Sequence, residues 1–491
     1  MGWLTFWPAG LKFVTAWSSK RRTIAVKKYD LVVIGAGPAG LAGALQAHEL
    51  GLSVVVLDDG KRPGGQIYRN LENLTDKMRS ILGKSYLNGE TLLRNAKHMG
   101  LDIRAEAVVW HISAEKIVYF VQKDEVAAVE AEAIMLATGA LERPFPVPGW
   151  TLPGVMTAGG AQIAMKSGSA IPAGRIVLAG CGPLLYLVAG QLAQAGANVQ
   201  AVLDTTPRGN YWRAIRHTKL GFTSLKQLLD GIGMIRTMSA YGIRKIGQVD
   251  DIRIRGENRA DAVEYSTSSV SGIIEADYIL LHQGVVPNIQ LYRHLGCEIR
   301  WDDSQLCFHP VIDGNWQTSV PGIFAVGDNA YIMGARAAEY SARLAALQIA
   351  ENNKLIIDPK VKGFIKRKFR QLTEIRKFID TLYRPLSQFR IPPRENTVIC
   401  RCEEITAGEI TDLAAAGCAG PNQAKFFTRC GMGPCQGRNC GLTVTELFAH
   451  ATGKSPDQVG YYTIRSPIRP LPLAALARVE TNGLAADIEF S

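Results

Sequence analysis

The stretch that decides the fold is "YDLVVIGAGPAGLAGALQAHELGLSVVVLDDG", residues 29–60. It opens with the continuous apolar run "DLVVIG", which is typical of a parallel strand buried on both faces. Gly35, Gly37 and Gly40 then form a GxGxxG pattern. The first glycine allows a tight turn, the second allows a pyrophosphate to approach the backbone, and the third allows the following helix to pack closely against the strand. The pattern predicts a dinucleotide-binding unit, with Asp58 after the second strand as the acceptor for a ribose.

The composition is that of a folded α/β protein long enough for two to four domains. Hydrophobic residues make up 47% of the 491 residues and charged residues 20%, which excludes a disordered or fibrous chain. Much of the net charge of +11 comes from residues 361–394, and no nucleic-acid-binding motif accompanies it. We therefore expect no nucleic acid among the partners. Nine cysteines are too few for a disulfide scaffold, which favours a reducing, cytoplasmic location.

The first 28 residues differ from the rest, because an apolar, aromatic run precedes the basic stretch "SSKRRTIAVKK". A signal peptide has the opposite order, and the run is shorter than the ~20 apolar residues that span a bilayer. We predict a loosely ordered leader over residues 1–28. The alternative is a peripheral contact with the inner face of a membrane, or with a partner, through its aromatic side chains. No transmembrane helix is expected elsewhere in the sequence.

A second strand–turn–helix–strand pattern lies further along, in "RIVLAGCGPLLYLVAGQLAQAGANVQAVLD", residues 175–204. Its turn keeps two glycines, but Leu185 replaces the third, and Asp204 keeps the acid of the second strand. A leucine at this position should push the helix away from the strand and alter the nucleotide pocket. We predict a second Rossmann-like domain that has lost efficient use of NAD(P)H. A site for ATP or weakly bound NAD is the alternative.

Three further stretches occur in a fixed order: "RPGGQIYR" (residues 62–69), "AIMLATGALERPFPVPG" (133–149) and "TSVPGIFAVGD" (318–328). With the first glycine turn they resemble flavoproteins of the glutathione-reductase type, which implies bound FAD. By that resemblance Asp328 approaches the ribityl and pyrophosphate groups. The residues expected to bind FAD are Gly35, Gly37, Pro38, Ala39, Gly40, Asp58, Gly65, Gln66, Thr138, Gly139, Gly327 and Asp328. No CxxC pair exists, so thiol–disulfide exchange is not expected.

Two cysteine pairs stand near the end of the chain, one spaced CxC and one C-x4-C. Between them Thr406 and Glu409 form a capping box, which predicts a helix ended by Gly417. The pattern resembles the [2Fe-2S] domain of bacterioferritin-associated ferredoxins, although that family usually has C-x2-C as its second pair. Tetrahedral zinc is the alternative. The expected ligands are Cys400, Cys402, Cys435 and Cys440, and Cys430 is expected to lie outside the site.

The segment "KGFIKRKFRQLTEIRKFIDTLYRPL" (residues 362–386) connects these regions. Its apolar residues recur at helical spacing, and the opposite face is basic. This predicts a docking helix with a solvated basic side. An anionic membrane surface or an acidic partner is the alternative use of that charge.

The combination of "RPGGQIYR", "ATGALERPFPVPGWTLPGVMTAGGAQ", "GCGPLLYLVAGQLAQAG" and "CRCEEIT…TRCGMGPCQGR" is more specific than its parts. It is similar to the large subunits of opine oxidases, the middle subunit of hydrogen cyanide synthase and the α subunits of heteromeric proline or hydroxyproline dehydrogenases. The similarity extends over roughly residues 28 to 465. It implies a heteromer in which a partner flavoprotein of the D-amino-acid-oxidase type oxidises a C–N bond, sometimes together with a further small subunit.

In that family electrons pass from the partner to the cofactors of this subunit, in some members through an FMN at the interface, and on to an acceptor such as a quinone. We therefore expect an FAD- and [2Fe-2S]-containing electron-transfer subunit of an opine or amino acid dehydrogenase, with no catalytic residue of its own. His282, His294 and His309 are expected to be structural, because each stands alone in the sequence. The alternative is a self-sufficient NAD(P)H-dependent oxidoreductase.

The expected fold class is α/β, with two Rossmann-like domains of the glutathione-reductase type and a small helical [2Fe-2S] domain. The expected domains follow the motifs along the chain. They are the leader (1–28), the FAD-binding domain (29–150 and 276–355), the second Rossmann-like domain (151–275), the basic helix and linker (356–394), the [2Fe-2S] domain (395–465) and an extended tail (466–491).

Overall fold

The computed structural model describes residues 26–217 and 222–477. Most of the predicted leader (1–25) and the end of the predicted tail (478–491) lie outside these ranges. None of the helices in the described ranges is long and apolar enough to cross a bilayer. Strand β1 (Lys27–Ile34) begins two residues inside the predicted leader, so the first domain starts at Lys27.

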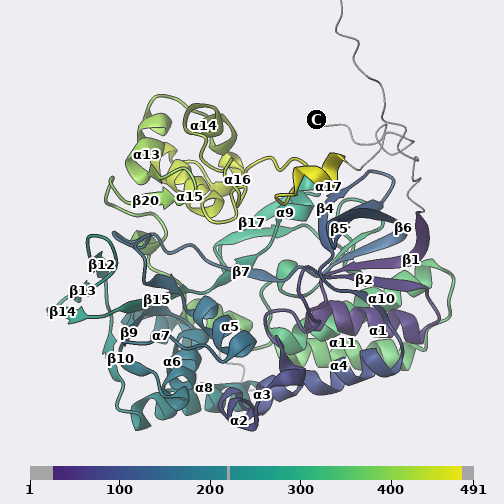
Figure 1. Ribbon diagram of the computed structural model, residues 1–491, viewed down its shortest axis with the longest axis horizontal. Coiled ribbons are helices and arrows are strands. Elements are labelled where there is room, and N and C mark those ends of the chain that lie inside the picture. The colour runs from purple at the N-terminus through teal and green to yellow at the C-terminus, as the bar shows by residue number, and fades with distance from the viewer. Residues whose placement is uncertain (1–25, 218–221, 478–491) are drawn as a thin grey trace, which may run out of the picture.

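The first domain is built on an open sheet with buried parallel strands at its centre (Figure 1). The order is β3-β2-β1-β6-β5-β4, and β19 pairs with β6. β1 runs parallel to β2 and β6, whereas β5 and β4 are antiparallel. This is the parallel core that the apolar run and glycine turn predict. The other strands are β2 (Val54–Leu57), β3 (Asp102–Arg104), β4 (Val108–Ile112), β5 (Ile117–Gln122), β6 (Glu125–Leu136) and β19 (Ile323–Ala325).

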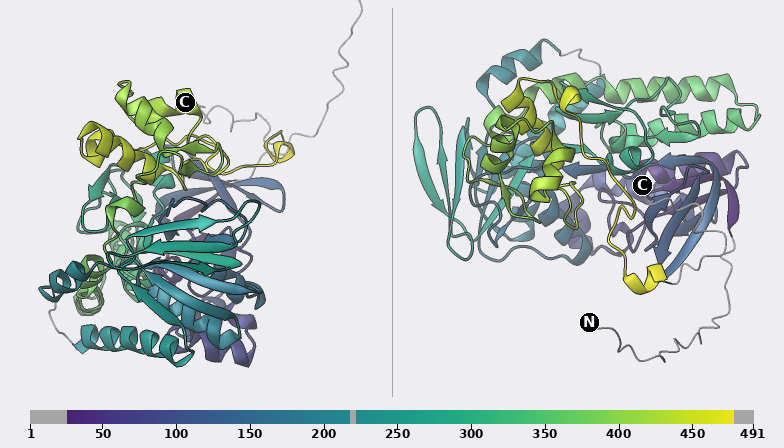
Figure 2. Two further views of the ribbon diagram at one scale, coloured as in Figure 1. Left: turned by 90° about the vertical axis from the view of Figure 1, so that its left-hand side faces the viewer. Right: turned by 90° about the horizontal axis from the view of Figure 1, so that it is seen from above.

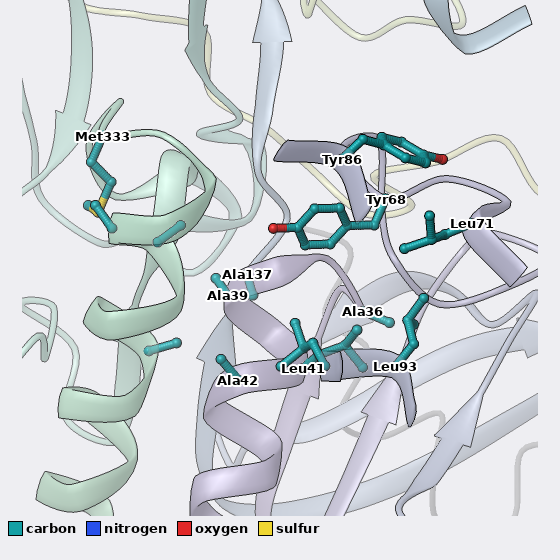
Figure 3. Packing of buried hydrophobic residues seen from close by; sticks show 14 of the residues in the cluster. Ala36, Ala39, Leu41, Ala42, Tyr68, Leu71, Tyr86, Leu93, Ala137 and Met333 are labelled. Atoms are coloured by element: carbon teal, nitrogen blue, oxygen red, sulfur yellow. The ribbon is translucent and has the colours of Figure 1, made fainter. Parts of the chain in front are cut away.

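Helices α1 (Pro38–Glu49) and α10 (Ala335–Asn352) pack against each other on one face of this sheet. A Cβ atom at Gly43 of α1 would come within 3.2 Å of the Ala342 Cβ, so a glycine is needed for the close approach. Figure 3 shows Ala39 and Ala42 of α1 facing α10. The remaining elements of the domain are η1 (Leu71–Asn73), α2 (Asp76–Leu82), α3 (Lys84–Leu87), α4 (Gly89–His98), α9 (Gln290–His294), β17 (Ile299–Asp302), β18 (Cys307–Pro310) and η2 (Gly327–Asn329).

The second domain has a parallel sheet of its own, in the order β11-β10-β9-β15-β8. Strand β15 lies inside this sheet although the sequence pattern assigns residues 276–283 to the first domain, because its apolar run "YILLHQ" is buried between β9 and β8. After β15 the chain enters β16, which pairs with β7 where the chain crosses between the two domains. The elements are β7 (Ala140–Glu142), β8 (Val155–Thr157), α5 (Ala158–Gly168), β9 (Arg175–Cys181), α6 (Pro183–Ala195), β10 (Asn198–Asp204), α7 (Arg208–Ile215), α8 (Phe222–Ala240), β11 (Arg244–Gly247), β12 (Asp251–Arg255), β13 (Ala262–Ser266), β14 (Ser271–Glu275), β15 (Tyr278–Gln283) and β16 (Val285–Pro287).

The basic segment forms two helices, α11 (Pro359–Thr373) and α12 (Arg376–Leu382), where the spacing predicts one continuous stripe. The apolar stripe is confirmed, since Ile365, Ile375 and Leu382 are buried. The first helix ends where the Thr373 hydroxyl donates to the carbonyl oxygens of Phe369 and Arg370, an interaction that favours bending of a helix. α11 packs on α10 of the first domain, and α12 packs on α7 of the second.

The small domain at the end of the chain lies over the two sheets (Figure 2). Its first helix begins with the predicted capping box of Thr406 and Glu409, and Gly417 follows its end with a φ of 89°. After the last helix of the small domain that precedes Ile468, the chain crosses to the first sheet. There the Ile468 N–H donates a hydrogen bond to the Trp110 carbonyl oxygen. The elements are η3 (Ser387–Phe389), β20 (Val398–Cys400), β21 (Ile405–Thr406), α13 (Ala407–Ala415), α14 (Pro421–Thr428), α15 (Gly441–Thr452), α16 (Pro456–Val459) and α17 (Leu473–Ala477).

A buried ion pair fastens this small domain to the linker that precedes it. Arg390 follows η3 and pairs with Glu446 of α15, and their side chains are only 12% and 4% exposed. We expect Arg390→Ala to destabilise the protein by about 3 kcal/mol or more, because Glu446 is left buried without a partner. A lowered midpoint of thermal unfolding measures the effect. Arg300→Ala removes an exposed pair and should change stability by less than about 1 kcal/mol; equal effects of both changes would contradict the prediction.

Candidate functional site

A cavity of about 820 Å³ lies between the two sheets and gathers the residues that the sequence predicts for FAD. Gly40 and Gly327 are not in its lining. A Cβ at Gly40 would overlap the Gly35 carbonyl oxygen, and one at Gly327 would lie 2.7 Å from the Ala39 Cβ, so these two glycines serve close packing instead. The predicted residues that line the cavity are Gly35, Gly37, Pro38, Ala39, Asp58, Gly65, Gln66, Thr138, Gly139 and Asp328.

The first glycine turn forms a bare backbone cradle at the start of α1. Gly35 has a φ of 105°, and a Cβ there would lie 2.5 Å from the Ala137 carbonyl oxygen. At Gly37 a Cβ would have no neighbour closer than the Gly65 Cα, at 3.9 Å, because the position faces the cavity. No side chain caps the N-terminus of α1, so its first N–H groups are free for an anion. This cradle fits the pyrophosphate of a dinucleotide.

Two carboxylates line the cavity together with the cradle. The Asp58 carboxylate accepts hydrogen bonds from the N–H groups of Ala36 and Gly60, at 2.5 and 2.7 Å. Asp328 accepts from the N–H groups of Met333 and Gly334, both at 2.9 Å, just before α10. Burial raises the pKa of both acids, and the backbone hydrogen bonds oppose that rise. The hydrogen bonds fix both side chains in the cavity lining, where polar groups of a cofactor can reach their free lone pairs.

The second glycine turn differs from the first in what surrounds its acid. Asp204 is 1% exposed, and it accepts hydrogen bonds from the Tyr186 hydroxyl at 2.7 Å and the Thr206 N–H at 2.9 Å. Lys245 completes the set at 3.0 Å. Leu185, in place of the third glycine, is fully buried in the core. The acid that would bind a ribose is therefore already engaged by the protein.

Five cysteines gather in the small domain in two adjacent groups. The sulfur atoms of Cys400, Cys430 and Cys440 all lie within 4.8 Å of one another, and all three residues are buried. Cys402 is exposed and forms hydrogen bonds with half-buried Cys435. Cys430 therefore lies beside two of the four expected ligands, and its expected place outside the ligand set stays a prediction. Arg429 has a φ of 60°, and the left-handed turn there brings Cys430 close to Cys400.

The three buried sulfurs form one hydrogen-bonded group. Hydrogen bonds from the Cys430 and Cys440 thiols, and from the backbone N–H groups of Gly431 and Glu403, lower the pKa of Cys400 far below its usual range. The hydrogen bond to Cys400, together with burial, raises the pKa of Cys430 to about 12. The Tyr462 hydroxyl donates to Cys430 Sγ at 3.4 Å. A donor set of sulfur alone, stabilised as a thiolate by amides, suits iron–sulfur or zinc chemistry.

The glycines around these cysteines pack against side chains, a role that the sequence does not reveal. A Cβ at Gly433 would overlap the Cys402 Cβ, and one at Gly431 would lie 2.6 Å from the Tyr462 ring. Gly431 also contributes directly to the sulfur site, because its N–H donates to the Cys400 sulfur.

Sequence reasoning missed a histidine–carboxylate pair in the main cavity. His282 Nδ1 lies 2.7 Å from Glu142 Oε1, and both residues line the cavity. The other two histidines of interest contact the backbone as structural histidines do: His294 Nε2 lies 3.2 Å from the Ile112 carbonyl oxygen, and His309 Nδ1 lies 3.0 Å from that of Ala330. Because 140 residues separate His282 from Glu142, no local spacing could indicate the pair.

Comparisons with known proteins agree with both parts of the architecture. Residues 29–342 match the family described as "Pyridine nucleotide-disulphide oxidoreductase", and residues 394–479 match the "Sarcosine oxidase A3 domain". The opine oxidase A subunit of Agrobacterium tumefaciens (strain Ach5) is 43% identical over 468 residues, covering 92% of each chain. The HcnB subunit of hydrogen cyanide synthase from Pseudomonas aeruginosa is 31% identical, covering 92% of this chain and 99% of the relative. The crystal structure of L-proline dehydrogenase from P. horikoshii has the same fold, with a TM-score of 0.68 at 20% identity over 92% of this chain and 80% of that one.

Proposed function

Because the chain belongs to the pyridine nucleotide-disulphide oxidoreductase family and, within it, to the family of the opine oxidase A subunits, we propose that it is the FAD- and [2Fe-2S]-containing electron-transfer subunit of a heteromeric amine dehydrogenase or oxidase. The family implies a flavoprotein oxidoreductase. Its relatives are named as subunits, which supports a partner chain. The observation that carries the proposal is the pairing of an open dinucleotide cradle with a sulfur-only site in one chain.

The donor set favours a [2Fe-2S] cluster with Cys400, Cys402, Cys435 and Cys440 as ligands. Three sulfurs within 4.8 Å would suit a single ion, whereas two bridged irons need a wider set of four thiolates. Cys402 and Cys435 widen the set toward the exposed side of the domain. Because Cys400, Cys402, Cys435 and Cys440 complete that set, we assign Cys430 a supporting role beside Cys400, where its sulfur accepts a hydrogen bond from the Tyr462 hydroxyl. When bound, such a cluster carries one electron at a time beside a flavin that takes two.

The substrate-oxidising chemistry belongs, in this proposal, to a partner of the D-amino-acid-oxidase type that acts on an opine or an imino or amino acid. An FMN at the interface would connect the two subunits, and a quinone would serve as the final acceptor. Two observations support a partner. The lining of the cavity in this chain includes the residues of the FAD cradle. The similar chains are named as subunits of opine oxidase and of hydrogen cyanide synthase.

We expect the purified chain with bound FAD to remain oxidised when NADH or NADPH is added. The reason is Asp204, which Tyr186, Thr206 and Lys245 engage, so that no carboxylate is free for the nucleotide ribose. Anaerobic absorbance spectra before and after each addition measure the reduction, with dithionite as the positive control. Addition of the partner flavoprotein and its amine substrate should then bleach both flavin and cluster. Rapid bleaching by NAD(P)H alone would favour the self-sufficient reductase instead.

A further inference from the structure

The cavity has an arm in the second domain that the FAD cradle does not explain. Residues at the second glycine turn and at the end of β15 line it, namely Cys181, Gly182, Pro183, Leu184, His282 and Gln283. In a complete dinucleotide site this arm would receive a pyridine nucleotide. Here the acid of that site, Asp204, is engaged by protein groups. The binding of a pyridine nucleotide therefore does not account for this part of the cavity.

The His282–Glu142 pair belongs to the lining of the same cavity as the FAD cradle. Glu142 ends β7, the strand that follows Thr138 and Gly139, and β7 pairs with β16 just after His282. The Glu142 carboxylate also accepts from the Gly159 N–H, at 3.1 and 3.2 Å, in the first turn of α5. These contacts hold the carboxylate against His282 Nδ1.

The orientation of the imidazole follows from that contact. An ionised carboxylate only accepts hydrogen bonds, so Nδ1 carries the proton and Nε2 has a free lone pair. The Nε2 edge faces the second glycine turn, since a Cβ at Gly182 would lie 3.4 Å from it. Among the described residues, no group forms a hydrogen bond with Nε2. His282 thus offers an unused proton-accepting nitrogen to the cavity lining.

No other histidine in the chain combines these features. All eight lie in the described ranges, and His282 alone bonds a carboxylate. His111 Nδ1 meets the Ser466 hydroxyl, His294 contacts the backbone of Ile112, and His309 contacts the Ala330 carbonyl oxygen and the Cys307 thiol. His111 also has an unpartnered Nε2, but its other nitrogen meets a hydroxyl, whereas the carboxylate on His282 gives the base-and-orienter arrangement of proton-transfer sites.

We infer that His282, oriented by Glu142, is the proton site coupled to the redox state of the flavin. The inference rests on the proposed function, because it requires FAD in the cradle. For each two electrons that arrive, two protons enter: one goes to the flavin and one to His282 Nε2. Both protons leave when the two electrons pass on one at a time. The imidazolium is stabilised by the Glu142 carboxylate, and its charge offsets the negative charge of a flavin reduced by two electrons and one proton.

The other ionisable groups around His282 do not duplicate this role. Burial raises the pKa of Cys181 on β9 to about 12, so it stays a thiol, and it donates to the Gln283 side chain. Burial also raises the pKa of Tyr383, beyond α12, above its usual range. Arg143 follows Glu142, but its guanidinium turns away to the carbonyl oxygens of residues 305 and 306, at 2.6 and 2.8 Å.

The test is the pH dependence of the flavin midpoint potential in the purified chain, measured by spectroelectrochemistry near neutral pH. Uptake of two protons changes the two-electron equilibrium 100-fold per pH unit, a slope of about 59 mV. His282→Gln should halve this to a tenfold change, about 30 mV, and Glu142→Gln should reduce it in the same direction. His98→Gln, an exposed histidine on α4, is the matched control and should leave the slope unchanged.

Each outcome decides the inference. A two-proton slope in the unchanged chain that His282→Gln reduces supports it, provided that FAD content is retained. A one-proton slope in the unchanged chain, or equal slopes in both proteins, overturns the proton site and leaves the proposed function standing. If His282→Gln does not fold, Glu142→Gln decides by the same criterion. A chain that binds no FAD at all overturns the proposed function and this inference with it.

Discussion

Gly37→Val should purify as a folded protein without FAD, with affinity for the cofactor at least about 100-fold weaker, or about 3 kcal/mol. The cradle accepts a pyrophosphate because bare backbone faces the cavity there. A side chain at Gly37 would meet no protein atom closer than 3.9 Å, so the fold tolerates it. The added methyl groups would instead occupy the space of the phosphates. Flavin absorbance per chain, with isothermal titration of added FAD, measures the loss.

Two glycine variants separate cofactor loss from misfolding. Gly363→Val, on the solvent face of α11, has open space around it and should keep a full complement of FAD. Gly40→Val should fail to fold, since a Cβ there would overlap the Gly35 carbonyl oxygen. If Gly37→Val retained flavin at the level of Gly363→Val, FAD would have to bind somewhere other than this cradle.

The parts of the site that could be predicted are those whose signal is contiguous in the sequence. The glycine turn at Gly35 and Gly37 carries its strand, helix and acid within thirty-two residues, so the fold and the cavity lining both follow from it. The capping box of Thr406 and Glu409 is likewise local, and the structure has the helix that it predicts. In each case the residues that determine the local structure are close together in the sequence.

The parts that could not be predicted depend on how distant segments meet. Glu142 and His282 come together only because β7 and β16 pair where the chain crosses between the two sheets. β15 belongs to the second sheet because it pairs with β9, although the sequence pattern assigns its residues to the first domain. The position of Cys430 depends on a left-handed turn at Arg429, a conformation that the sequence "TRCGMG" does not specify.

Cys440→Ala should abolish the metal centre completely, leaving less than about one tenth of the iron and acid-labile sulfide. Cys440 is buried at the start of α15, and its sulfur belongs both to the compact group with Cys400 and Cys430 and to the proposed set of four thiolates. Four thiolates complete a [2Fe-2S] cluster, and an alanine removes one of them. Retention of iron through Cys430, whose sulfur lies within 4.8 Å of that of Cys440 in the unchanged protein, would contradict the expected loss. Iron and sulfide analysis, with the visible absorbance of the cluster, measures the loss.

The identity of the other ligands is decided by comparing Cys430→Ala with Cys402→Ala. Both changes remove one sulfur from the same domain, but Cys430 is fully buried under Cys400 and bonded to Tyr462, while Cys402 is exposed beside Cys435. We expect Cys430→Ala to keep close to two iron and two sulfide per chain, and Cys402→Ala to lose both. The reverse result would make the compact group of Cys400, Cys430 and Cys440 the ligand set. Zinc without sulfide in the unchanged protein would replace the electron-transfer centre with a structural one, because zinc has no redox chemistry.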